Sequence, residues 1–233
     1  MVDKRCFRDE IISKFHDGQT VMTGGFCFHG CPDLLLDALI DSGARHMTNI
    51  ALDVSACKLM HLGIFDKVIL AHAGTIPENL ELMASGKIEV EFCPMGTIAE
   101  RIRAGGSGLG GVLVKTGLGT DAQKGKQLIE VNGETWILET ALRPDISLAR
   151  AETADCYGNL TYRGAARNSL HRRGRRFQHR AGRQVYGAGG DAPENVVTPG
   201  IFMARAVIVE RFRHFRRADM PGAASPIGPR ICR

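Results

Sequence analysis

Short apolar runs along the chain alternate with longer stretches in which apolar residues recur at helical spacing. Runs typical of buried strands cover residues 19–23, 47–52, 68–71, 88–92 and 146–149. Helical patterns lie between most of these runs. Strands that alternate with helices predict parallel crossover connections. The pattern therefore predicts an α/β fold with a Rossmann-like, mostly parallel sheet flanked by helices.

The predicted helices cover residues 3–15, 32–42, 77–84 and 98–104. The first two carry one-sided apolar residues, namely Phe7, Ile11, Ile12 and Phe15, then Leu34, Leu35, Ala38 and Leu39. Proline suits the first turn of a helix because its missing N–H costs nothing there. Pro32 therefore marks a helix start, and Ser42-Gly43, Ser85-Gly86 and Gly105-Gly106 mark helix ends.

A β-hairpin is predicted at residues 127–139, where two β-rich runs flank Asn132-Gly133, the preferred pair for a type I′ turn. Trp136, the only tryptophan, is expected to pack there as core. Before the hairpin, residues 104–120 are glycine-rich. This stretch is either a flexible loop or a segment whose backbone approaches a ligand or partner chain closely. Its glycines lack the spacing of a dinucleotide fingerprint.

The bulk composition narrows the class of protein. The 233 residues suffice for one α/β domain or two small ones, and no apolar run approaches the about 20 residues of a membrane helix. With no signal-peptide core, a soluble cytoplasmic protein is expected. The seven scattered cysteines do not indicate a disulfide framework. Residues 1–168 hold 17 basic and 21 acidic residues, whereas residues 169–233 hold 13 basic and 4 acidic residues. The net positive charge therefore comes from residues 169–233.

The first strand ends in the most informative local pattern. Residues 17–32 read DGQTVMTGGFCFHGCP, which is a strand, a glycine loop and a helix start. Such a loop exposes backbone N–H groups beside a positive helix end, and this suits a phosphate or a developing oxyanion. Taken alone, Gly24-Gly25 is also compatible with an ordinary turn.

The wider pattern resembles the signature of family I coenzyme A transferases, α subunit. Further segments resemble the same subunit in the same order: CPMGTIAERIRAGGSGLGG, KTGLGT, LRPDISLARAETADCYGNLTYRGAARN and ENVVTPGIF. The resemblance covers about residues 10–168 and 185–209 and is strongest to bacterial acetate/acetoacetate-type enzymes. Thr23 departs from it, because that position is usually aliphatic.

The resemblance implies transfer of coenzyme A (CoA) from an acyl-CoA to a free carboxylate, with the CoA thioester as substrate and no permanently bound cofactor or metal. A glutamate of a partner β subunit would attack the thioester and hold CoA as an enzyme thioester. No motif for that glutamate occurs in this chain, so no catalytic nucleophile is expected here. The resemblance implies a hetero-oligomer, in heterotetrameric or related form, with the β subunit.

The resemblance also implies a CoA-contact loop at Gly24, Gly25, Phe26, Cys27, Phe28, His29 and Gly30. Phe26 and Phe28 would wall the pocket, although Phe28 could equally be core. The oxyanion position falls on Met95 and Gly96. Relatives usually carry CPQGT there, with the glutamine reaching the thioester carbonyl. Met95 lacks that amide donor, so either the Gly96 N–H substitutes or the chemistry is altered.

Other polar residues admit less specific interpretations. Cys27, His29 and Cys31 could form a metal site, but no fourth ligand is evident and pocket-lining or buried groups are favoured. Glu100, Arg101 and Arg103 are expected to be surface or interface charges. Glu78 and Asn79 follow a strand, where ligand-facing residues occur, but a helix start is favoured.

The resemblance stops at residues 169–184, where six arginines in SLHRRGRRFQHRAGRQ replace an apolar helix of the family. The tail 211–233 is also foreign, so the transferase domain is predicted at 1–210 and the tail is expected to be poorly ordered. A solvated or disordered segment is favoured for 169–184. A compensated reading-frame slip in the source gene would also explain it, and resequencing decides this.

Two functions from other classes compete with a transferase subunit. A non-catalytic CoA-binding or assembly subunit is favoured by Met95 and by the basic segment. Nucleic-acid binding through the arginines of residues 170–183 is less favoured, because no recognised binding module surrounds them. No membrane partner is expected.

Overall fold

The computed structural model describes residues 3–26, 29–53, 57–73, 77–164, 177–186, 193–202 and 205–208. In these residues, no helix is both long enough and apolar enough to cross a membrane. The helices are α1 (Arg8–Ile12), α2 (Asp33–Ser42), α3 (Cys57–Met60), α4 (Pro77–Ala84) and α5 (Met95–Ser107), with short 3₁₀ helices at Asp121–Gln123, Pro193–Asn195 and Gly200–Phe202.

The main sheet holds nine strands within this described part of the chain, in the order β1-β12-β11-β9-β2-β3-β4-β5, with β10 beside β9. The strands are β1 (Arg5–Cys6), β2 (Thr20–Thr23), β3 (Met47–Ile50), β4 (Phe65–Leu70), β5 (Glu89–Phe92), β9 (Ile146–Asp155), β10 (Leu160–Thr161), β11 (Phe177–Tyr186) and β12 (Arg205–Ile208). Every pair is parallel except β9–β10. The predicted α/β fold with a mostly parallel sheet is confirmed.

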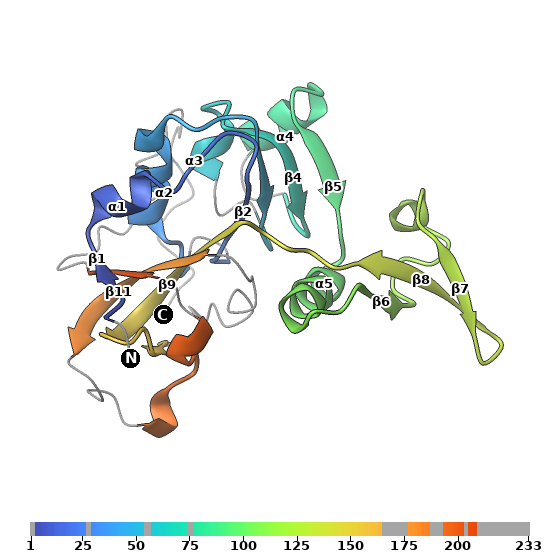
Figure 1. Cartoon of the computed structure of the whole chain (residues 1–233). Coiled ribbons are helices and arrows are strands. Elements are labelled where there is room, and N and C mark those ends of the chain that lie inside the picture. Colours follow the sequence, from blue (N-terminus) through green and yellow to red (C-terminus); the bar gives the residue numbers. More distant parts are fainter. Residues whose placement is uncertain are drawn as a thin grey trace, which may run out of the picture.

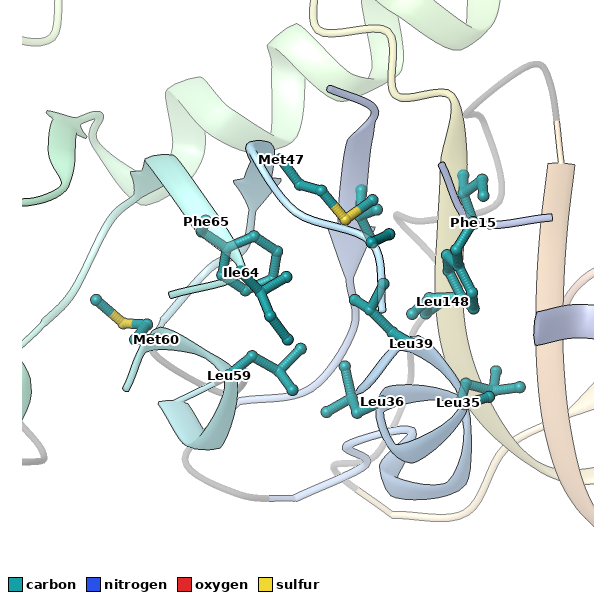
Figure 2. Close-up of a cluster of buried hydrophobic side chains, with 14 of the residues drawn as sticks. Phe15, Leu35, Leu36, Leu39, Met47, Leu59, Met60, Ile64, Phe65 and Leu148 are labelled. Atoms are coloured by element: carbon teal, nitrogen blue, oxygen red, sulfur yellow. The ribbon is translucent and has the colours of Figure 1, made fainter. Parts of the chain in front are cut away.

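Two apolar layers enclose this sheet, because successive strand residues point to opposite faces. Val21 joins the larger cluster, and its neighbour Met22 joins the smaller one. The larger cluster contains the buried side of α2, and Figure 2 shows Leu35, Leu36 and Leu39 of this helix in one cluster with Met47, Phe65 and Leu148 of the strands. The smaller cluster contains Ile98 and Ile102 of α5. Helices therefore cover both faces, as a parallel sheet requires.

Helix α2 is the clearest case of a helix that the sequence specifies locally. Leu35, Leu36 and Leu39 are at most 1% exposed, and each contributes about 1.5–3 kcal/mol by burial. The helix ends at Gly43, whose φ of 74° is the left-handed conformation that glycine adopts without strain. The predicted boundaries of this helix are confirmed to within one residue.

A second, antiparallel sheet, which we call the small sheet, has the order β6-β8-β7. It consists of β6 (Gly111–Val114), β7 (Leu128–Val131) and β8 (Glu134–Thr140) and lies beyond α5, away from the main sheet (Figure 1). The predicted hairpin is confirmed, because Asn132 and Gly133 both have positive φ, 54° and 77°. Trp136 is only partly buried, so its assignment to the core was wrong.

The glycine-rich stretch is ordered and not a flexible loop. Gly105 lies within α5, and a Cβ built there would stand 2.0 Å from the carbonyl oxygen of Leu142. A Cβ at Gly111 would stand 2.5 Å from the carbonyl oxygen of Glu139. These two glycines therefore allow close approach of backbone from the same chain, and the predicted approach to a ligand or partner chain stays a prediction.

The N-terminal helix is shorter than predicted. Strand β1 occupies Arg5–Cys6, and α1 covers only Arg8–Ile12. Ile11 and Phe15 are buried as expected, whereas Phe7 precedes the helix and is 82% exposed. Pairing of β1 with β12, about 200 residues away, overrides the local helical pattern.

Strand β11 falls in the basic segment that the sequence suggested to be solvated or disordered. For residues 177–184 that expectation was wrong, because they pair in parallel with β9 on one side and β12 on the other. The structure does not describe residues 169–176 or the tail 211–233. The arginines of the 170–183 cluster that precede residue 177 therefore lie outside the described residues.

Candidate functional site

The order of strands in the main sheet reverses between β2 and β9. From β2 the chain moves outward through β3, β4 and β5, and from β9 it moves the other way through β11 and β12. In open parallel sheets, ligands bind outside the carboxyl ends of the strands at such a switch point. Strand β2 ends at Thr23, so the predicted CoA-contact loop begins at this point.

The loop is a tight hairpin. The Phe26 N–H donates to the His29 carbonyl at 3.0 Å, and the His29 N–H donates to the Phe26 carbonyl at 2.9 Å. Phe26 is 43% exposed and His29 is also exposed. Cys27 and Phe28, between them, lie outside the described residues, so neither their predicted ligand contacts nor a metal site that includes Cys27 is tested.

The three loop glycines are not exposed, contrary to the expectation from the sequence. Gly24, Gly25 and Gly30 are buried in the chain. The Gly24 N–H donates to the Leu148 carbonyl of β9 at 2.8 Å. The expectation that this amide faces a ligand was wrong, because it already completes the pairing of β2 with β9.

Gly25 is required by both backbone conformation and space. Its φ is 117°, which side chains rarely allow, and an added Cβ would stand 2.7 Å from Cys31 Sγ. Gly25 therefore folds the loop back onto Cys31 just before α2, and the bridged residues Phe26 and His29 are exposed.

We expect Gly25→Ala to reduce the free energy of unfolding by about 2–5 kcal/mol, from backbone strain and from the clash with Cys31. Gly63→Ala is the matched control, because Gly63 has a φ of 62° and no heavy atom within 4 Å of an added Cβ. It should cost only about 1–2 kcal/mol. Urea unfolding of both variants measures the difference, and equal losses would contradict the role assigned to Gly25.

The predicted oxyanion position lies at the end of β5. Met95 is the first residue of α5 and is 44% exposed, and Gly96 is exposed beside it. The first N–H groups of a helix have no partner within the helix. The intrahelical ladder of α5 begins with the Ile98 N–H, which donates to the Pro94 carbonyl at 2.9 Å. The Gly96 N–H is therefore one of the N–H groups at the start of α5 that have no acceptor within the helix.

A buried ion network lies behind this helix start. Arg101 is only 5% exposed, so the expectation of a surface charge was wrong for this residue. Glu100 and Arg103, which were also expected to be surface or interface charges, pair with each other at the partly exposed side of α5. Arg101 Nη1 donates to Glu91 Oε1 at 2.6 Å, and its Nε donates to the Thr140 carbonyl at 2.8 Å. Arg101 thus joins β5 of the main sheet to β8 of the small sheet.

Burial and charge shift the pKa values in this network. Burial alone would raise the pKa of Glu91, but Arg101 and then Lys67 outweigh it, so the pKa lies below its usual value. Burial raises the pKa of the Cys93 thiol, although Arg101 Nη1 lies 3.6 Å from its sulfur. Cys93 is therefore a neutral thiol and not a nucleophile at neutral pH.

Buried polar side chains gather at the carboxyl ends of β2 and β3. The Thr23 hydroxyl donates to Asn49 Oδ1 at 3.1 Å, and Asp53 follows β3 at 2% exposure. The sequence pattern did not single out Asn49 and Asp53. Their signal was available, because a polar residue within a buried strand must be compensated by a partner.

Asn79 is completely buried in the first turn of α4, and within the described part of the chain neither its amide nitrogen nor its carbonyl oxygen has a hydrogen-bond partner. The predicted helix start is confirmed. Leu82 and Met83, three and four residues later, pack against the larger apolar cluster, so Asn79 faces the sheet as they do. Two unpaired buried polar atoms are a cost to folding.

We expect Asn79→Leu to raise the free energy of unfolding by about 1–3 kcal/mol, because it removes unpaired buried polar atoms at similar side-chain size. Asn159→Leu is the control, since the Asn159 amide bonds Asp155 at 2.6 Å and accepts from the Gly200 N–H at 2.7 Å. That variant should lose stability. Urea unfolding distinguishes the two signs, and a loss in Asn79→Leu would refute the cost assigned to this residue.

Residues 8–209 match the family model described as coenzyme A transferase. The chain is 46% identical over 159 residues to the alpha subunit of acetate CoA-transferase from Escherichia coli K12, covering 66% of this chain and 72% of that one. It is 36% identical to a subunit of 3-oxoadipate CoA-transferase from Acinetobacter baylyi, covering 97% of this chain and 100% of that one.

Among solved structures, an acyl-CoA transferase of Escherichia coli O157:H7 (YdiF) superposes with a TM-score of 0.76 at 19% identity. The alignment covers 89% of this chain and 47% of that one, so this chain spans about half the length of that enzyme. This similarity supports the fold, and the sequence similarity supports the family. The chain belongs to the coenzyme A transferase family, in which it corresponds to the α subunit of a two-subunit enzyme.

Proposed function

We propose that this chain is the α subunit of a short-chain acyl-CoA:carboxylate CoA-transferase of the acetate, acetoacetate and butyrate class. The observation that carries the proposal is that the Phe26–His29 hairpin and the start of α5 follow β2 and β5 at the same edge of one sheet. One supplies an exposed loop for CoA, and the other supplies the Gly96 N–H for the thioester oxygen.

The nucleophile in this proposal is a glutamate of the partner β subunit. Its carboxylate attacks the thioester carbonyl, the CoA thiolate leaves, and an acyl-glutamyl anhydride forms. The thiolate then attacks the glutamyl carbonyl, which releases the carboxylic acid anion and leaves a glutamyl-CoA thioester. The acceptor carboxylate reverses both steps. One thioester replaces another, so no net energy source is required.

In this scheme the α subunit binds and orients the substrate. The Gly96 N–H donates to the oxygen that becomes negative during attack, and such a donor in a water-excluded site lowers the barrier. The exposed Phe26 would pack against CoA. We further propose a heterotetramer of two α and two β subunits, acting in the cytoplasm.

Coexpression with its β subunit tests this function. The complex should exchange CoA between acetyl-CoA and acetoacetate, whereas the isolated α chain should not. Incubation of the complex with acyl-CoA should add CoA, with loss of water, to the β subunit in intact-mass spectra and leave the α chain unchanged. Turnover by the α chain alone, or a CoA adduct on it, would refute the division of roles. A complex that binds CoA without turnover would support the non-catalytic alternative.

A further inference from the structure

One face of the small sheet has an apolar centre. Residues directly opposite each other in an antiparallel sheet share a face. Leu113 lies opposite Leu138, and Ile129 lies opposite Trp136, with Val131 two positions after Ile129. Trp136 and Leu138 are also two positions apart, so all five side chains lie on one side of the sheet. We call these five residues the apolar face of the small sheet.

The opposite face is already covered by the chain itself. Ile137 and Glu139 alternate with the apolar-face residues of β8 and are 0% and 2% exposed. A Cβ built at Gly117, in the loop after β6, would stand 3.8 Å from Ile137 Cδ1. Side-chain nitrogens of Lys126 and Arg101 lie 2.7 Å and 3.7 Å from the Glu139 carboxylate. This face therefore packs against the loop after β6 and against α5.

The apolar face has no comparable cover among the described residues. Leu113 and Val131 are 38% and 37% exposed, and the other three side chains are partly exposed. None of the five belongs to a buried apolar cluster or packs against one. Lys115 pairs with Glu134, and its Nζ lies 4.8 Å from the centre of the Trp136 ring. An exposed apolar centre with a polar rim is typical of a contact with another protein.

The charge of this rim favours an apolar protein partner over a polyanion. Lys115 is already paired with Glu134, so the two side chains together carry no net charge. Binding of phosphate groups, as in CoA or a nucleic acid, depends on basic side chains whose charge is not compensated. The occupant that fits the apolar face is therefore an apolar protein surface.

The β subunit is the partner whose position is already constrained. This step rests on the proposed function, in which a glutamate of the β subunit reaches the thioester at the Gly96 N–H. Arg101 binds the carbonyl of Thr140, at the end of β8, from a point on α5 roughly 9 Å along the helix from Met95. A standard interface buries about 800 Å² on each partner, which is a patch roughly 30 Å across. One interface can therefore extend from the start of α5 onto the apolar face.

We propose that the apolar face of the small sheet docks an apolar surface of the β subunit, in one interface with the start of α5. A second copy of this chain would instead form a symmetric pair through the same face. The β subunit is favoured because the proposed reaction requires it, and not a second α chain, at the start of α5.

Leu113→Lys is expected to raise the dissociation constant of the coexpressed α–β complex at least about tenfold, because it places a charge in the apolar centre of the interface. Leu128→Lys is the matched control. Leu128 is 43% exposed on the same sheet, but it lies opposite Ile137 and therefore on the other face. This variant should leave the dissociation constant unchanged. Sedimentation velocity over a dilution series measures both variants, and equal weakening by the two would overturn the proposal.

Photocrosslinking tests the same contact without weakening it. The photoreactive amino acid p-benzoylphenylalanine, placed at position 113 in the complex, should crosslink the α chain to the β subunit. At position 128 it should not. Mass spectrometry identifies the crosslinked chain. A crosslink from position 113 to a second α chain, or none to the β subunit, would overturn the proposal.

Neither measurement requires turnover, so the docking surface and the proposed function can fail separately. A complex that Leu113→Lys weakens and that exchanges no CoA supports the docking surface and counts against transferase activity alone. A complex that exchanges CoA between acetyl-CoA and acetoacetate, but whose dissociation constant is unchanged by Leu113→Lys, overturns the docking surface alone.

Discussion

Replacing Arg101 with methionine is expected to lower the free energy of unfolding by about 3–5 kcal/mol. The cost arises because removal of one partner leaves buried acidic groups without their counter-charge. Glu139 is 2% exposed and lies 3.7 Å from Arg101 Nη1, and Glu91 accepts a hydrogen bond from the same nitrogen. Lys126, 2.7 Å from Glu139, compensates only part of this charge.

The matched control lies on the same helix. Arg103 pairs with Glu100 at a side-chain exposure of 40%, so Arg103→Met should cost no more than about 1 kcal/mol. Urea unfolding measures both variants. Trp136 reports locally, because it is the only tryptophan and lies on the small sheet that Arg101 joins to β5. Similar losses in the two variants would show that Arg101 is not the connecting residue.

The pH dependence of this effect follows from Glu91. Its pKa is below the usual value in the folded chain, although burial alone would raise it, because Arg101 and Lys67 outweigh burial. A carboxyl group whose pKa is lower in the folded chain than in the unfolded chain stabilises the fold fully at pH values above the unfolded-state pKa. This contribution to the free energy of unfolding is lost as the pH falls through the folded-state pKa. The difference between wild type and Arg101→Met should therefore shrink on acidification, and a difference that grows would contradict this.

Met95→Gln is expected to increase kcat of the α–β complex by about 100- to 1,000-fold, if the side-chain amide donates to the thioester oxygen beside the Gly96 N–H. Met95 is exposed at the start of α5, so the substitution requires no repacking of the core. Steady-state kinetics with acetyl-CoA and acetoacetate measures the change, and the free energy of unfolding should hardly move.

Met95→Leu separates the donor from a general effect of substitution at this position. It keeps an apolar side chain without an amide, so kcat should stay within a few fold of wild type. An increase in both variants would mean that methionine obstructs the site. No increase in Met95→Gln would mean that the Gly96 N–H suffices, or that the position does not touch the reacting oxygen.

The parts of the fold that could be predicted depend on neighbours in sequence. The spacing of Leu35, Ala38 and Leu39 and the stop at Gly43 specify α2, and Asn132-Gly133 specifies the hairpin. Boundaries were missed where a distant partner extends an element. Strand β9 continues to Asp155, well past the predicted residue 149, because β11 and β10 supply its partners.

The candidate site divides in the same way. The sequence located the loop after β2 by its glycines, and the family resemblance marked Met95 and Gly96, but the helix was predicted at residues 98–104, whereas α5 runs from Met95 to Ser107 and includes Gly105 and Gly106. The sequence could not show that the Gly24 amide is already used by Leu148, or that Arg101 is buried, since both facts depend on contacts with residues far along the chain.

Strand β11 shows the limit most plainly. Strands in the middle of parallel sheets usually read as apolar runs, and FQHRAGRQVY does not, so no local pattern indicates it. By itself the sequence determined the α/β class, the family and the two segments that end at the site. Only the tertiary structure decided which amides, ions and apolar side chains remain available there, because availability depends on what distant parts of the chain have already bound.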